Sequence, residues 1–86
     1  MNYEDRMREK LTAAFAPELL EIIDESEAHR GHGGYKEGGE THFKIIIKAA
    51  AFNGMSRVAQ QRAVMVAVKA ELKERVHALA LEVSGV

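Results

Sequence analysis

The chain has 86 residues, a formal net charge of −1 and a hydrophobic share of 47%, which predicts one small domain over residues 1–86 with a modest core. It contains no cysteine, and this excludes a disulfide framework, a cysteine-based zinc site and a thiol nucleophile within the chain. The charged N-terminus is unlike a secretory signal, and no apolar run approaches the roughly 18–20 residues of a membrane span, so we expect a soluble, cytoplasmic protein that does not enter membranes.

The first predicted element is an amphipathic helix between Asn2 and Pro17. Asn2 suits the N-cap position, and the acids Glu4 and Asp5 favour the first turn because they complement the helix dipole. Pro17 ends the helix, since the residue before a proline avoids helical geometry. The apolar side chains recur at i, i+4 spacing, which predicts a core-facing stripe: Tyr3, Met7, Leu11 and Phe15.

Two strands are predicted next. The segment Glu18–Glu25 is interpreted as a strand, with Leu20 and Ile22 on one face, although helix is a competing interpretation. The segment His42–Ala49 alternates clearly, so one face should be buried. The core face of this second strand consists of Phe43, Ile45, Ile47 and Ala49.

A glycine- and histidine-rich loop, Glu25–His42, separates these strands. It holds five of the seven glycines and three of the four histidines, His29, His32 and His42. A hairpin needs only about two to five connecting residues, so a loop of this length is either disordered or functional. The histidines favour function, because imidazole is the commonest metal ligand and titrates near neutral pH.

After a turn over Phe52–Ser56, Ser56 is expected to cap a helix that runs from about Arg57 to about Arg75, with its start broken into a short first turn. Val58, Met65 and Leu72 recur every seven residues along it. The last predicted element is a strand over 76–83. Its alternation places His77, Leu79, Leu81 and Val83 on one side.

The element order predicts an α+β fold with a three-stranded mixed sheet packed against helices. The first two strands should be antiparallel, and the third should run parallel to the second after a right-handed helical crossover. The end of the first strand and the starts of the other two then share one edge of the sheet. This topology predicts that His77 comes close to the loop histidines.

Each histidine also has a structural interpretation. His42 is commonly a polar surface residue in such a position, His77 could be a hydrogen-bonded structural imidazole, and His29 and His32 could face solvent. Two or three imidazoles without a thiolate make a poor complete zinc site. A metal site completed by a partner protein fits the pattern better, and it would leave the isolated chain free of metal.

The sequence resembles the BolA family over roughly residues 5–83. The matching stretches are Asp24-Glu-Ser, the glycine-rich loop, Gly39-Glu-Thr-His-Phe43, Phe52-Asn-Gly-Met-Ser-Arg57, Arg62-Ala-Val64 and Val76-His-Ala-Leu-Ala-Leu81. The resemblance implies a single αββ(α)αβ domain that is similar to the class II KH domain. It also implies an interaction module and not an enzyme, in keeping with the absence of nucleotide-binding and hydrolase motifs.

The resemblance further implies a monothiol glutaredoxin as partner, with a shared 2Fe–2S cluster used in iron–sulfur assembly, trafficking or iron-dependent regulation. The glutaredoxin and glutathione would supply thiolates, and this chain would supply imidazole. By motif, His77 is one ligand and a loop histidine is the other. Counting from Glu25-Ser26 favours His29, whereas counting back from residues 40–43 favours His32, and the choice stays open.

The resemblance also carries a second function, that of a DNA-binding transcriptional regulator of the stress or morphology type. Residues 43–75 hold seven bases and two acids, which suits an acidic partner, although a solvated helix face explains the same charges. The candidate contacts are Arg57, Arg62 and Lys69. Many relatives carry Arg-His-Arg where this chain has Gln60-Gln61-Arg62, which weakens the DNA interpretation. Whether the chain forms a homodimer stays open.

Overall fold

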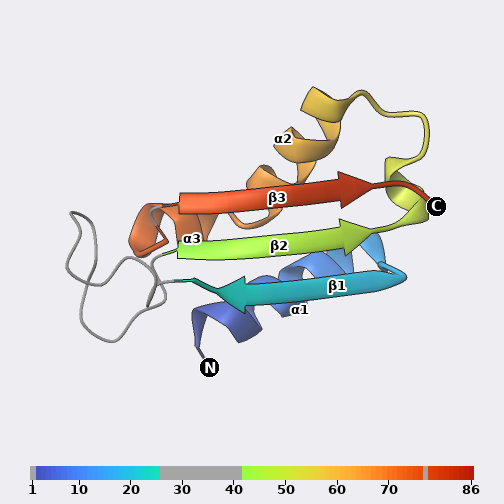
Figure 1. Ribbon diagram of the computed structural model, residues 1–86. Coiled ribbons are helices and arrows are strands. Elements are labelled where there is room, and N and C mark those ends of the chain that lie inside the picture. The colour runs from blue at the N-terminus through green and yellow to red at the C-terminus, as the bar shows by residue number, and fades with distance from the viewer. Residues whose placement is uncertain (1, 26–41, 77) are drawn as a thin grey trace.

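The chain forms three α-helices, one short 3₁₀-helix and three strands within the residues that the computed structural model describes, which are 2–25, 42–76 and 78–86. All three α-helices lie on the same face of the sheet, and none of the described helices covers the opposite face (Figure 1). None of the described helices is long and apolar enough to cross a membrane. In chain order the elements are α1 (Tyr3–Phe15), β1 (Leu19–Asp24), β2 (His42–Lys48), η2 (Ala50–Phe52), α2 (Arg57–Ala67), α3 (Lys69–Glu74) and β3 (Ala78–Ser84).

The sheet has the order β1-β2-β3, with β2 at its centre. β1 pairs antiparallel with β2, so that Ile22 lies opposite Ile45, and β3 pairs parallel with β2, so that Leu81 also lies beside Ile45. The predicted α+β fold with a three-stranded mixed sheet is therefore confirmed, including the direction of every strand. The parallel pair requires the helical crossover through α2 and α3, because a tight turn cannot connect parallel strands.

The core lies between the helices and the covered face of the sheet. Phe43, Ile45 and Ile47 are buried and alternate with partly exposed neighbours, as the sequence pattern predicted. Helix α1 contributes its predicted stripe residues Met7 and Leu11, which are completely buried. Further fully buried side chains from the C-terminal half close the core: Ala49, Phe52, Val64, Val68 and Val76.

Side-chain caps begin the two longer helices as predicted. The Asp5 N–H donates to Asn2 Oδ1 at 2.8 Å, and the Ala59 N–H donates to Ser56 Oγ at 3.1 Å. Each bond satisfies a backbone donor that has no partner within its helix. At its other end α1 stops at Phe15, where Ala16 takes a left-handed conformation with φ of 45° directly before Pro17.

The second helical region differs from the prediction. It starts without a break at Arg57 and is interrupted instead near its end, at Val68, which separates α2 from α3 with φ of −110° and ψ of 24°. The β-branched residues Val64, Val66 and Val68 weaken the helical preference at this point. The interruption allows α3 to direct Glu71, which is completely buried, toward α1.

Candidate functional site

Three chain segments meet at one edge of the sheet, where β1 ends and where β2 and β3 begin. Asp24 pairs with Phe43, and His42 pairs with Ala78. Beyond the last β1 residue, the Glu25 N–H donates to the His42 carbonyl oxygen at 2.7 Å. This hydrogen bond joins Glu25 and His42, the two residues that flank the segment 26–41. Ala78 lies beside His42 on the other side of β2.

The predicted ligands His29, His32 and His77 lie outside the described residues. His29 and His32 belong to the segment that connects Glu25 to His42, and His77 precedes Ala78 in the chain. The topological part of the prediction is confirmed, because the strand ends that flank these histidines share an edge. Their role as ligands stays a prediction.

The described residues contain no ready metal site. No group of three or more histidine, cysteine, aspartate or glutamate side chains within residues 2–25, 42–76 and 78–86 is arranged to hold an ion. His42, the one histidine that is described, is half-buried in the first position of β2.

Behind this edge, α3 is attached to α1 by a buried carboxylate. Glu71 is completely buried, and Lys10 Nζ donates to both of its oxygens, at 3.0 Å to Oε1 and 2.7 Å to Oε2. Arg6 Nε donates to Oε2 at 3.1 Å. A carboxylate this deep in the protein is tolerated because cations and hydrogen bonds compensate the loss of water.

A second carboxylate extends this contact to the surface. Arg6 makes a bidentate pair with Glu74, with Nη1–Oε1 of 3.1 Å and Nη2–Oε2 of 2.8 Å. The Arg6 guanidinium also lies 4.6 Å from the centre of the Tyr3 ring. The hydrogen bonds from Arg6 hold the pKa of Glu74 below its ordinary value, and Glu74 raises the pKa of Arg6. We call these five residues the α1–α3 contact: Tyr3, Arg6, Lys10, Glu71 and Glu74.

The α1–α3 contact fixes the path of the chain into β3. The Glu71 carbonyl oxygen accepts the N–H groups of Arg75 and Val76, at 3.1 and 3.0 Å, while its side chain is held by α1. Val76 is buried, and Ala78 is in register with His42. Both sequence neighbours of His77 are thus fixed by the fold.

Our sequence interpretation missed Glu71, although the sequence contains a signal for it. Glu71 follows Val64 by seven residues and Val68 by three, so it belongs to the apolar side of the helical region. A lone acid on that side indicates a buried cationic partner. The sequence offers no means of identifying the partners, because Lys10 and Arg6 lie 61 and 65 residues away.

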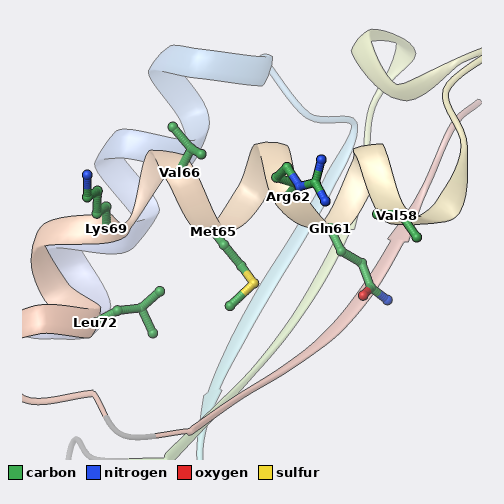
Figure 2. Close-up of a pocket in the computed structure, with 7 residues that line it drawn as sticks. All are labelled: Val58, Gln61, Arg62, Met65, Val66, Lys69 and Leu72. Carbon is green, nitrogen blue, oxygen red and sulfur yellow. The ribbon is translucent and has the colours of Figure 1, made fainter.

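The basic candidates Arg57, Arg62 and Lys69 are all exposed, but they do not form one cluster. Arg62 and Lys69 line a groove of about 480 Å³ along α2 and α3, shown in Figure 2. Arg57 lines a different hollow, between α2 and β3. We call the first hollow the α2 groove; its lining residues are Val58, Gln61, Arg62, Met65, Val66, Lys69 and Leu72.

Comparison with known proteins finds a matching family model and relatives of similar sequence. Residues 11–85 match the family model described as BolA-like protein. An uncharacterized protein of Sinorhizobium sp is 46% identical over 83 residues, which cover 95% of this chain and 89% of that protein. The DNA-binding transcriptional regulator BolA of Escherichia coli K12 is 38% identical over 81 residues, which cover 94% of this chain and 73% of the regulator.

The fold matches a solved structure equally well. BolA1 from Arabidopsis thaliana superposes with a TM-score of 0.88 at 34% sequence identity, and the match covers 99% of this chain and 93% of BolA1. The same three helices and mixed sheet therefore occur in both proteins.

Proposed function

The chain belongs to the BolA family, and from this premise we propose that it binds a monothiol glutaredoxin and supplies histidine ligands to a 2Fe–2S cluster that bridges the two proteins. The observation that supports this most is the shared sheet edge. The segment that contains His29 and His32 leaves and re-enters the sheet there, at Glu25 and His42, and β3 begins beside it at Ala78.

The donor set of the chain fits a shared cluster and not a self-contained one. The sequence has no cysteine, so every thiolate must come from glutaredoxin and glutathione. Two imidazoles can replace two thiolates on one iron of a 2Fe–2S cluster, as in Rieske centres, and this raises the reduction potential. In this proposal His77 is one imidazole ligand, and either His29 or His32 is the other.

The rigid surroundings of residue 77 are suited to a ligand role. Val76 is buried, Ala78 is hydrogen-bonded into the sheet, and Glu71 attaches the end of α3 to α1. A metal ligand works best when packing and hydrogen bonds hold its backbone in place. The bound cluster would supply one-electron chemistry or serve as transferable cargo, and the chain would hold one end of it.

The test is to titrate the purified chain into a cluster-loaded monothiol glutaredoxin and to record visible absorption and circular dichroism. We expect the spectra to change with the parent chain and not with His77→Ala. One of the variants His29→Ala and His32→Ala should also lose the change, which identifies the loop ligand. His42→Ala is the matched control and should behave like the parent. The proposal is wrong if the parent has no effect, or if His77→Ala acts like the parent.

DNA binding is the second candidate function. It is favoured by the similarity to a regulator described as DNA-binding and by the exposed cations Arg62 and Lys69. A KH domain holds a single strand of nucleic acid with a Gly-x-x-Gly loop. In the described residues the turn that precedes α2 contains only one glycine, Gly54, so this mode of binding receives little support. Binding through phosphate contacts should weaken steeply as salt increases. If duplex DNA shows no gel shift even at low salt, this candidate is excluded.

A further inference from the structure

The α2 groove contains half of the exposed large hydrophobic side chains of the described residues. Six large hydrophobic side chains in the described residues are exposed, and three of them line this groove. Val58 is 62% exposed, Met65 44% and Val66 67%. Val58 and Met65 lie two helical turns apart on α2, and Val66 follows Met65 directly (Figure 2). All three line the same groove, so they are neighbouring apolar side chains and not residues scattered singly over the surface.

The border of the groove is positively charged. Arg62 and Lys69 are seven residues apart, and the sequence from Arg57 to Ala70 contains no acid. Within the described residues neither Arg62 nor Lys69 makes an ion pair. Arg6, by contrast, is paired with Glu71 and Glu74. The groove therefore combines an apolar centre with two cations that are available to a carboxylate from another molecule.

Nucleic acid suits this surface less well than a peptide does. Single-stranded nucleic acid binds to proteins by stacking bases on aromatic side chains between cations. Among the described residues, no phenylalanine, tyrosine, tryptophan or histidine lines the groove, and its centre is aliphatic. Arginine and methionine are enriched in protein interfaces, and Met65 can adapt its shape to a partner because its side chain is flexible.

We propose that the α2 groove binds an amphipathic helix of a partner protein, with apolar side chains against Val58, Met65 and Val66 and with two carboxylates seven residues apart that pair with Arg62 and Lys69. A second copy of this chain does not fit well as the partner. Helix α1 carries three acids and three bases, and it already buries its apolar residues Met7 and Leu11 in its own core. The occupant we infer is thus an acidic helical segment of a different protein.

The proposal can be tested with a designed helical peptide of about 18 residues, long enough to form a helix on contact. The peptide carries leucines on one face and two glutamates seven residues apart beside them. A control peptide of the same composition carries the two glutamates on the opposite face. Binding is measured by fluorescence anisotropy, and the binding surface is located from amide shifts in NMR spectra of the ¹⁵N-labelled chain.

We expect amide shifts over 58–72 and about fivefold weaker binding of the control peptide, because it lacks the two ion pairs. The double variant Arg62→Glu/Lys69→Glu should prefer a peptide in which lysines replace the two glutamates. Lys48→Glu, an exposed residue at the end of β2, is the matched control and should bind like the parent. Val66→Ser should weaken binding without unfolding the chain, because Val66 is exposed.

Three outcomes would overturn the proposal. The first is equal affinity for the two peptides, since the charges would then be irrelevant. The second is amide shifts confined to residues outside 58–72. The third is displacement of the peptide by a DNA oligonucleotide at a lower concentration than the peptide requires, which would assign the surface to nucleic acid. The experiment uses neither glutaredoxin nor a cluster, so its result does not depend on the function proposed above.

Discussion

The α1–α3 contact and the α2 groove are two cationic regions of one small domain, and they differ in whether the cations have partners. In the α1–α3 contact, Arg6 and Lys10 are bonded to carboxylates of α3, one of which is completely buried. In the α2 groove, Arg62 and Lys69 border exposed aliphatic side chains and face no acid among the described residues. The same residue types thus stabilise the fold in one place and remain available for binding in the other.

The largest effect should follow from removal of the buried carboxylate. Glu71→Ala leaves a cavity and deprives Lys10 and Arg6 of their shared acceptor, although both cations can regain water because they are partly exposed. We expect a loss of about 2–3 kcal/mol in the free energy of unfolding, which lowers Tm by roughly 10–20 °C in a domain of this size. Urea and thermal unfolding monitored by far-UV circular dichroism measure both quantities.

Glu82→Ala is the control for this variant. Glu82 also forms an ion pair, with Lys44 at 3.8 Å, but its side chain is 61% exposed. Its removal should change stability by less than about 0.5 kcal/mol. If both variants lost the same free energy of unfolding, the burial of Glu71 would not make its ion pairs more stabilising than the exposed pair of Glu82.

The next largest difference should separate two valines on opposite sides of α2. Val64 is completely buried, whereas Val66 is 67% exposed in the groove. Val64→Ala should cost about 2 kcal/mol, because it removes buried methyl groups and leaves a cavity, and Val66→Ala should change stability by less than about 0.5 kcal/mol. Both variants make the same chemical change in the same helix, and urea denaturation compares them directly. A large loss with Val66→Ala would mean that the groove is packed within the chain.

A smaller effect concerns acid stability. The hydrogen bonds from Arg6 hold the pKa of Glu74 below its ordinary value of 4.5, so the folded chain binds this proton less tightly than the unfolded chain does. The stability that this pair contributes is complete above about pH 4.5, and it is lost as the pH falls through the lower pKa of the folded state. Glu74→Gln should therefore make stability less dependent on pH in the acid range.

Urea unfolding midpoints between about pH 3 and pH 6 measure this dependence. Arg6→Gln should show a similar reduction, because Arg6 is the donor in the pair. An unchanged pH profile in both variants would contradict the assignment of the pKa shift to this ion pair.

The smallest effect should come from the groove cations. Arg62→Gln removes a charge that contacts no carboxylate within the described residues, so the free energy of unfolding should change by less than about 0.5 kcal/mol. Arg6→Gln, which breaks contacts to two glutamates, is the comparison in the same urea assay. If Arg62→Gln destabilised the chain as much as Arg6→Gln, Arg62 would have a partner inside the protein.

Much of the fold could be predicted from local pattern. The alternation of Phe43, Ile45 and Ile47 predicts the central strand, and Asn2 and Ser56 mark the starts of helices through their capping oxygens. These signals depend on residues that are close in sequence. The interruption at Val68 was not predicted, because β-branched residues weaken the helical preference only slightly and do not by themselves fix where a helix breaks.

The candidate sites were predictable to different degrees. The meeting of strand ends at Glu25, His42 and Ala78 follows from element order and crossover handedness alone. The buried position of Glu71 depends on partners more than sixty residues away. The α2 groove was also missed, because the seven-residue recurrence of Val58 and Met65 does not reveal that the structure exposes both side chains.

The parallel pairing of β3 with the central strand has a consequence for how the chain folds. α1, β1 and β2 can begin to associate while later residues are still being synthesised, since β1 and β2 pair antiparallel. β3 is the last element, yet Leu79, Leu81 and Val83 pack against the core, and closing a contact between distant segments is slow. Residues 78–84 must therefore have left the exit tunnel of the ribosome before the hydrophobic interior can close. A chain truncated before Ala78 should be a substrate for proteases.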